Sequence, residues 1–293
     1  NRKMEYPSVR CRAVVDWIDL EIHTVKPTNF MTVQKVFRQI QHLPSDVNPY
    51  VEAVDEGPGG AASVFRVRIQ DPKNSHVLDS LCSACADVMP LQSNPKVTAI
   101  EIAFDAYNSS PEQAARFYKY ITFLADKSNH RLYRAKSDIT RGTPLNFQLL
   151  ISHLAEGWQV GIGNKSDDCY QHIYWKTTDN GVTLPPSEHR ARVEITLRGA
   201  SLPMKDLDDL RNFNFATLAK YFQFRELKDD LSQLARVTIG IMQNAGERSS
   251  RRCFKGGSRL YAQSTKADIE LNGRARNALR DLSRRWKASS PNH

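Results

Sequence analysis

The pattern of apolar and polar residues between positions 97 and 107 predicts a β-strand with two unlike faces. In "VTAIEIAFDAY", Ile102 and Phe104 lie on one face, because neighbouring residues of a strand point to opposite sides. Glu101 and Asp105 share the other face, with only a small alanine between them. Two carboxylates on an otherwise apolar strand need partners, because a buried unpaired charge is costly.

The same pattern places this strand at the end of a longer series. The sequence predicts a strand over 11–24, a helix over 28–43 capped by Thr28 or Asn29, a hairpin around "DEGPGG" and a helix over 76–89. This order is that of the ferredoxin-like βαββαβ unit, whose first and last strands are antiparallel neighbours. We therefore expect Asp19, Glu21 and His23 to lie next to Glu101 and Asp105, on the face that the helices leave open.

More strands and a helical last third are predicted further along. The pattern indicates a helix from Ser110, with Pro111 at its first position and Gln113 as capping-box partner, and strands over 157–163, 169–176 and 190–199. After residue 200 it indicates helices over 215–243 and 272–287 around a basic loop over 246–261. We predict an α+β fold: a ferredoxin-like core extended by further antiparallel strands, in a domain of residues 1–200, and a helical, basic segment of residues 201–293.

The positive charge of the chain is concentrated in its last third. The 293 residues carry a formal net charge of +9, and from Ser201 onward 18 Lys and Arg face 10 Asp and Glu, a net of +8. A polyanionic partner is the simplest explanation, and a solvated basic surface is the alternative.

Composition indicates a protein of the cytosol. The sequence has no apolar run long enough to span a membrane, and Asn1 opens a polar segment unlike a signal peptide. Five scattered cysteines favour reduced thiols. We expect a cytoplasmic location and no membrane partner.

Carboxylates gathered on an open sheet face have three interpretations. They bind a hard divalent cation, they act as an acid/base pair as in glycosidases, or they pair with arginines such as Arg192 and Arg198. The basic last third favours phosphodiesters over sugars as substrates, because a bound metal polarises a scissile phosphate.

Three segments, in order, resemble the replication initiation factor (Rep_trans) family of rolling-circle initiators and related relaxases. "AIEIAFD" at 99–105 is similar to the family's first acidic strand, although Ala99 replaces an arginine and Glu101 an aspartate. "VGIGNKSDDCYQHIYWK" at 160–176 resembles its second motif, and "RVEITLRG" at 192–199 its third. The resemblance covers roughly residues 12–200. It implies a fold related to the HUH endonucleases, although the chain has no His-hydrophobic-His motif.

The resemblance also implies metal-dependent nicking and joining of DNA by a tyrosine, at the replication origin of a plasmid, phage or mobile element. Glu101, Asp105 and Glu194 are expected to hold Mg²⁺ or Mn²⁺, while Lys176 contacts the phosphate and Tyr174 helps to position it. Staphylococcal initiators of the family carry the nucleophile soon after the third motif. Residues 195–220 contain no tyrosine, so Tyr221 is the expected nucleophile; Tyr107 and Tyr261 are the competitors.

The expected partner is DNA, as a single-stranded or hairpin origin with flanking duplex; a host helicase and a second copy of the chain are further expected partners. The residues expected to bind DNA are Arg192, Arg251, Arg252, Lys255, Arg259, Arg274 and Arg276. Two other functions stay open: a DNA-binding regulator that has lost the nucleophile, and an acid/base hydrolase of small substrates.

Overall fold

The computed structural model describes residues 9–57, 60–134, 137, 139–143, 146–179, 181–228 and 264–288. The chain divides into two compact units. Unit 1 comprises Asn1–Ala13, Phe104–Ile195 and Ala216–Leu279, and unit 2 comprises Val14–Ala103, Thr196–Phe215 and Arg280–His293. Three strands and the last helix contribute residues to both units. The predicted division at residue 200 stays a prediction.

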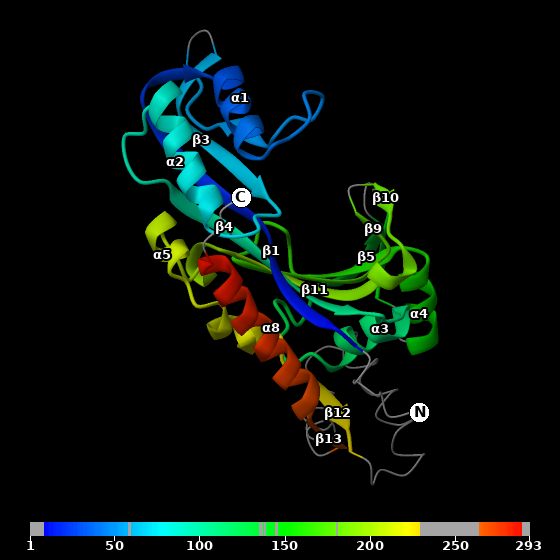
Figure 1. The fold of residues 1–293 in the computed structure, drawn as a ribbon. Helices are drawn as coiled ribbons and strands as arrows, with labels where there is room; N and C mark the ends of the chain where they lie inside the picture. Colours follow the sequence, from blue (N-terminus) through cyan, green and yellow to red (C-terminus); the bar gives the residue numbers. More distant parts are fainter. Residues whose placement is uncertain are drawn as a thin grey trace. The chain divides into compact units, whose positions relative to one another are not determined.

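Unit 2 contains the predicted βαββαβ series (Figure 1). Its elements are β1 (Cys11–Asn29), α1 (Phe30–Ile40), β2 (Val51–Ala53), β3 (Ala61–Gln70), α2 (His76–Val88) and β4 (Lys96–Tyr107), followed later in the chain by η4 (Gly199–Ser201) and α5 (Leu207–Arg211). The strand order β2-β3-β1-β4 is that of the ferredoxin-like unit, with antiparallel pairing of β1 with β3 and of β2 with β3. The predicted core is confirmed.

Local sequence explains where the first helix begins and corrects one predicted cap. The Asn29 side chain accepts a hydrogen bond from the backbone N–H of Met31, so Asn29 caps α1 as one of the two predicted residues. Helix α3 (Pro111–Tyr120) does begin with proline, but Ser110 makes no side-chain cap. The capping box predicted with Gln113 is therefore wrong, and that glutamine is buried instead.

Unit 1 carries the further antiparallel strands. Its elements are α3, β5 (His130–Arg134), β6 (Thr140–Gly142), α4 (Phe147–Ala155), β7 (Trp158–Ile162), β8 (Cys169–Lys176), β9 (Thr178–Asp179), β10 (Val182–Thr183), η3 (Pro186–Glu188) and β11 (Arg190–Arg198), of which the last continues into unit 2. The strand order here is β4-β11-β8-β7-β5-β6, and β9 and β10 form a separate hairpin. The α+β class with a large antiparallel sheet is confirmed.

The segment after residue 214 differs from its prediction. Phe215–Tyr221 is a 3₁₀ helix, η5, and Arg225–Leu227 is a strand, β12, paired with β13 (Thr265–Ala267). The long helix predicted from residue 215 is therefore wrong at its start, because Phe222 and Phe224 pack individually on Phe104 rather than along a helical stripe.

The last helix, α8 (Ile269–Lys287), matches the predicted basic helix over 272–287. The basic loop over 246–261 lies outside the described residues. In the described part of the chain, no helix is long and apolar enough to cross a membrane. The cysteines there, at positions 11, 82, 85 and 169, are free thiols.

Candidate functional site

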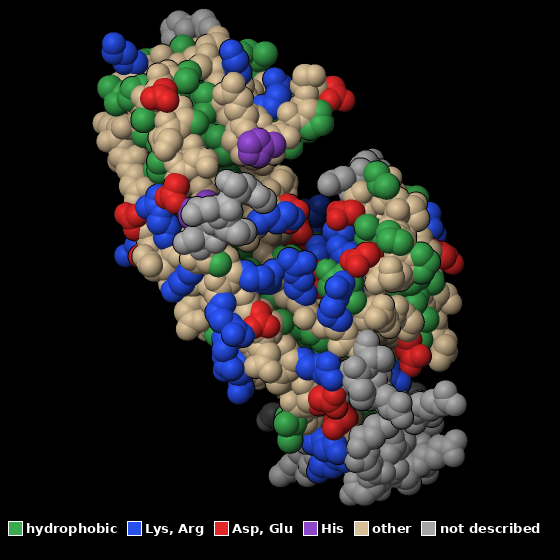
Figure 2. Space-filling model, viewed as in Figure 1, with side chains coloured by type: hydrophobic (Ala, Val, Ile, Leu, Met, Phe, Trp, Pro, Cys, Tyr) green, Lys and Arg blue, Asp and Glu red, His purple; other side chains and the backbone are tan. Residues whose placement is uncertain are grey.

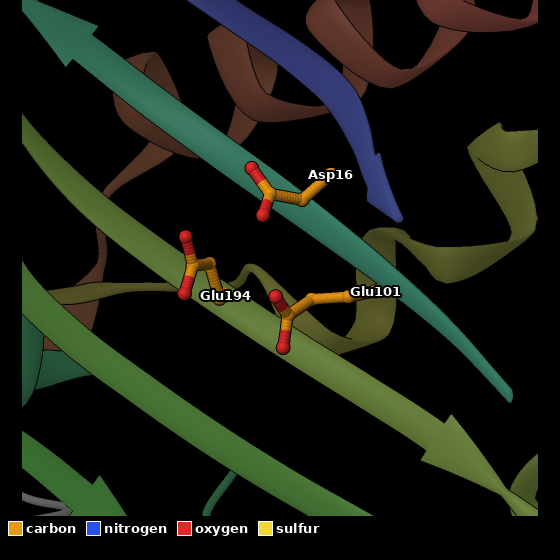
Figure 3. Close-up of side chains that lie close together, drawn as sticks. All are labelled: Asp16, Glu101 and Glu194. Carbon is orange, nitrogen blue, oxygen red and sulfur yellow. The ribbon is translucent and has the colours of Figure 1, made fainter. Parts of the chain in front are cut away.

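Three carboxylates gather on strands β1, β4 and β11. One oxygen from each of Asp16, Glu101 and Glu194 lies within 4.8 Å of the other two (Figure 3). Glu101 and Glu194 are buried, and Asp16 is half-buried. Carboxylate oxygens are the donors that hard divalent cations prefer, so this buried acidic cluster can bind a metal ion.

Asp16 reaches the cluster because the alternation of β1 changes within the strand. Ala13 and Val15 are buried at odd positions, whereas Ile18 and Leu20 are buried at even positions. Trp17 and Ile18 are both buried, so the alternation breaks between them. Strict period-two alternation places Asp16 on the face opposite Asp19 and Glu21, so the sequence did not predict Asp16 as a metal ligand. The prediction that the carboxylates lie on an open sheet face is wrong, because Glu101 and Asp105 are buried.

The other acids of β1 are occupied by basic neighbours within unit 2. Asp19 accepts two hydrogen bonds from the Arg68 guanidinium, at 2.5 and 2.7 Å. Glu21 pairs with His23 at 2.9 Å and with Lys96 at 3.4 Å. The expected adjacency of β1 and β4 is confirmed by the strand order. Asp19 and Glu21 therefore form ion pairs with basic side chains, which was one of the three interpretations of the carboxylates on this sheet face.

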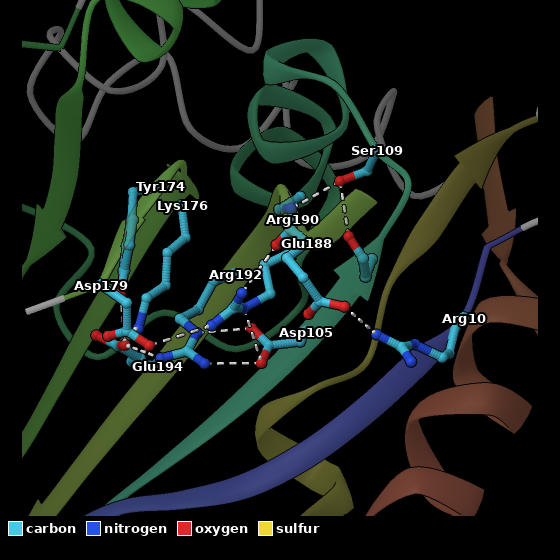
Figure 4. Close-up of polar contacts among 12 residues, drawn as sticks. Arg10, Asp105, Ser109, Tyr174, Lys176, Asp179, Glu188, Arg190, Arg192 and Glu194 are labelled. Atoms are coloured by element: carbon cyan, nitrogen blue, oxygen red, sulfur yellow. Dashed lines mark hydrogen bonds and ion pairs between the residues drawn. The ribbon is translucent and has the colours of Figure 1, made fainter. Parts of the chain in front are cut away.

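Asp105 is held by arginines. Its carboxylate accepts hydrogen bonds from Nε and Nη2 of Arg192, at 2.6 and 2.7 Å, and Arg190 Nε lies 3.3 Å away (Figure 4). The side chain of Asp105 is fully buried. The structure therefore brings Glu101 and Glu194 together with Asp16, while both oxygens of Asp105 are engaged by guanidinium groups.

Glu194 has the richest set of partners in the cluster. It accepts hydrogen bonds from the Tyr174 hydroxyl at 2.7 Å and from Arg192 at 3.2 Å, and His172 Nδ1 lies 2.9 Å from its other oxygen. Burial by itself raises the pKa of Glu194, but the hydrogen bond and charge of His172, with the charge of Arg192, lower it to about 2. Glu194 is therefore an anion at neutral pH.

Strand β8 presents a line of polar side chains to this carboxylate. Tyr170, His172, Tyr174 and Lys176 stand at alternate positions and share a face. The ring of His172 lies against that of Tyr174, with centroids 4.5 Å apart, and its Nε2 lies 2.8 Å from the Tyr133 hydroxyl. Figure 4 shows Tyr174 and Lys176 side by side, directed toward Glu194 and Asp179. The sequence predicts that these residues of β8 share a face, but it does not predict that Tyr133 contacts His172.

Tyr221 packs among aromatic side chains of unit 1. Its ring packs edge-on against Phe123, with centroids 4.7 Å apart, and the side chain is buried. The next residues pack on Phe104, which points away from Asp105 on β4. Tyr107 does share the face of Asp105. Its ring lies 4.1 Å from the Arg10 guanidinium, and burial raises its pKa.

The expected DNA-binding residues fall into three groups. Arg192 is buried in the ion pairs described above. Arg274 donates to the backbone carbonyl of Val9 and to Glu270, whereas Arg276 is exposed on α8. The remaining four residues lie outside the described part of the chain, as does Tyr261: Arg251, Arg252, Lys255 and Arg259.

The carboxylate cluster leads to a prediction about stability and metal. Without metal, Glu101→Gln is expected to raise Tm, because it removes one of three mutually repelling charges. Mn²⁺ at 100 times its Kd is expected to stabilise the parent by about 2.7 kcal/mol and the variant much less. Thermal unfolding with and without Mn²⁺ measures both effects. Glu112→Gln, at an exposed acid paired with Arg116, is the matched control; an equal Mn²⁺ response in E101Q contradicts the assignment.

Comparison with known proteins gives a distant likeness among solved structures. No protein-family profile and no curated protein matches the chain. Among solved structures, the chain is similar to a rolling circle replication initiator protein from Geobacillus stearothermophilus, at 13% sequence identity and a TM-score of 0.35, over 95% of this chain and 99% of that one. A TM-score this low does not establish a common fold, so the assignments below rest on the residues of this chain.

Proposed function

We propose that this chain nicks and rejoins single-stranded DNA through a covalent tyrosine intermediate, with Tyr174 as the nucleophile. The observation that carries the proposal is the hydrogen bond, 2.7 Å long, from the Tyr174 hydroxyl to Glu194, a member of the carboxylate cluster. A nucleophilic tyrosine needs its phenol beside the group that stabilises charge on the phosphate. Tyr174 meets this condition, whereas the contact described for Tyr221 is with the ring of Phe123.

The chemistry divides among neighbouring side chains of unit 1. The phenolic oxygen of Tyr174 forms a bond to phosphorus while the bond from phosphorus to the 3′ oxygen breaks. The phenolic proton ends on the leaving 3′ oxygen by way of water, which leaves a 5′-phosphotyrosine and a 3′ hydroxyl. Glu194 orients the phenol rather than acting as a strong base, because its pKa is about 2. Lys176, two residues along the same face, contacts the phosphate.

Asp16, Glu101 and Glu194 are the residues that hold Mg²⁺ or Mn²⁺ in this proposal. The donor set fits, since it consists of carboxylate oxygens and contains neither thiol nor imidazole. When bound, such an ion polarises the scissile phosphate and offsets its charge. Asp105, with its oxygens on Arg192, then acts by fixing the arginine that bonds Glu194.

The biological setting extends this proposal. The ordered motifs of the three strand segments support rolling-circle replication of a plasmid, phage or mobile element, with the origin as a single-stranded or hairpin site. A host helicase and a second copy of the chain belong to the same proposal. Single-stranded substrate suits a nucleophile on a strand, because an unpaired strand can lie flat on the sheet face.

Helix α8 supplies a second contact to DNA. Arg276, Arg280 and Arg284 are exposed and stand four residues apart, so they fall on one face of the helix. Figure 2 shows Lys and Arg side chains gathered along the strip of surface that α8 occupies. Such a stripe binds the phosphates of the flanking duplex without reading its sequence.

This contact has a measurable salt dependence. Replacing Arg276 and Arg280 with Gln is expected to flatten the slope of log affinity against log salt by roughly 1 to 2 on duplex DNA. Arg274→Gln is the matched control, because that guanidinium is engaged by Val9 and Glu270. A double variant with the parent's slope contradicts the contact.

One experiment tests the central proposal. The protein is incubated with Mn²⁺ and a pool of random-sequence single-stranded oligonucleotides, and denatured products are examined by mass spectrometry for a covalent adduct. We expect a protein–DNA adduct whose trapped oligonucleotides share a sequence. Binding without any adduct favours the non-catalytic DNA-binding regulator, and the absence of both favours a hydrolase of small substrates.

A further inference from the structure

A polar pocket opens beside Tyr174 and Lys176, entirely within unit 1. Its volume is about 470 Å³. Its lining includes Arg134 at the end of β5, Glu156 just before β7, Gln159 on β7, and Thr177, Thr178 and Asp179 after β8. A pocket of this size suits a small ligand and excludes a duplex. It therefore adjoins the proposed nucleophile but does not contain the carboxylate cluster.

Each acid of the pocket is matched with a cation. Lys176 Nζ lies 3.0 Å from Asp179, whose other oxygen lies 4.0 Å from Arg190, and Arg134 lies 3.8 Å from Glu156. Burial raises the pKa of Asp179, but the hydrogen bond and charge of Lys176 lower it below its usual range. Asp179 is thus an anion that lies between the cationic groups of Lys176 and Arg190.

Asp179 is suited to leave that position. Its side chain is 48% exposed, whereas those of Lys176 and Arg190 are 12% and 7% exposed. It ends the two-residue strand β9 of a small hairpin that pairs only with β10. The exposed carboxylate of Asp179 can turn into solvent when a ligand phosphate takes its place, so that Lys176 and Arg190 keep an anionic partner.

We propose that this pocket binds one unpaired deoxynucleotide next to the scissile phosphate, with a phosphate replacing Asp179 at Lys176 and Arg190. The inference rests on the proposed function and specifies which nucleotide of the DNA strand the protein binds. Gln159 and the hydroxyls of Thr177 and Thr178 offer hydrogen bonds to a base edge or sugar. Gln159 also lies 2.9 Å from His172 Nε2, which links the pocket to the chain of contacts that ends on Glu194.

The probe is thymidine 3′,5′-bisphosphate, titrated by calorimetry without metal and compared with inorganic phosphate and with thymidine. We expect the bisphosphate to bind more tightly than either. Asp179→Asn is expected to tighten bisphosphate binding about two- to fivefold, because the internal competitor is removed. Asp71→Asn, at an exposed acid paired with Lys73, is the matched control and is expected to change nothing.

Two further variants separate the sources of affinity. Lys176→Met is expected to weaken bisphosphate and inorganic phosphate alike, about tenfold. Gln159→Leu is expected to weaken the bisphosphate alone, to the level of inorganic phosphate. Equal binding of bisphosphate and inorganic phosphate by the parent protein overturns the proposal, as does an unchanged affinity in a folded D179N variant.

The outcome is distinguishable from failure of the proposed function. Adduct formation on oligonucleotides is measured with the same protein preparations. An adduct without bisphosphate binding overturns the pocket while the nicking function stands. Bisphosphate binding that responds to D179N, without any adduct, supports the pocket and removes the covalent chemistry.

Discussion

Replacing Tyr174 with phenylalanine is expected to abolish the covalent protein–DNA adduct while leaving the fold and most of the DNA affinity intact. The change removes only the hydroxyl that would attack phosphorus, and the ring keeps its contact with His172. Loss of the hydrogen bond to Glu194 is expected to cost only about 0.5–1.5 kcal/mol of stability, because His172 and Arg192 still bond that carboxylate. Mass spectrometry of denatured products measures the adduct, and thermal unfolding measures the stability.

The matched controls are the other candidate tyrosines. Tyr221→Phe and Tyr107→Phe are expected to keep the adduct. The ring of Tyr221 packs on Phe123, and the ring of Tyr107 lies close to the guanidinium groups of Arg10 and Arg190. If Y221F loses the adduct and Y174F keeps it, the sequence-based assignment of the nucleophile is right and the one made from geometry is wrong. If the parent binds DNA and forms no adduct at all, the regulator hypothesis replaces the enzyme.

Local signals were sufficient for most of the fold. Period-two alternation gave β8 its bounds, Cys169–Lys176, and placed His172, Tyr174 and Lys176 on one face. The βαββαβ order followed from element types alone, and with it the adjacency of β1 and β4. Glu101 and Glu194 could be singled out because charges on otherwise apolar strands stand out in the pattern.

Other features depend on contacts between distant residues. Asp16 enters the cluster because the buried positions of β1 change from odd to even, which no local rule requires. The aromatic segment after residue 214 has helical spacing, yet Phe215 packs on Trp286 and Phe222 on Phe104, and these contacts override helix propensity. Tyr221 was chosen as the first tyrosine after the third motif, and our proposal of Tyr174 instead rests on its hydrogen bond to Glu194.

Asp105 shows why carboxylates on one strand need not share a task. Glu101 and Asp105 stand four residues apart on the same face, so sequence analysis gave both to the metal. In the structure, Glu101 accepts a hydrogen bond from Thr196 at 2.5 Å and lies within the carboxylate cluster, whereas Asp105 is bonded to Arg192. The nature of the neighbouring residue on β11, a threonine or an arginine, separates the two roles.

Asp105→Asn is accordingly expected to destabilise the protein by about 3–5 kcal/mol, because it leaves the buried guanidinium of Arg192 without its main counter-charge. The loss is expected with and without Mn²⁺, and the stabilisation that Mn²⁺ adds is expected to persist. Asp16→Asn is the matched comparison: like Glu101→Gln, it is expected to raise Tm without metal, because it removes one of the repelling carboxylates, and to lose the Mn²⁺ response. Thermal unfolding of both variants, with and without Mn²⁺, gives the four values needed.

The two variants thus separate an acid that supports the fold from an acid that holds a cation. An ion-pair partner affects stability whether or not metal is present, since its counter-charge is part of the protein. A ligand affects stability through the metal, because in its absence the carboxylates repel one another. A D105N protein that matches the parent without metal and loses the Mn²⁺ response would return Asp105 to the ligand set and leave Arg192 bonded chiefly to Glu194.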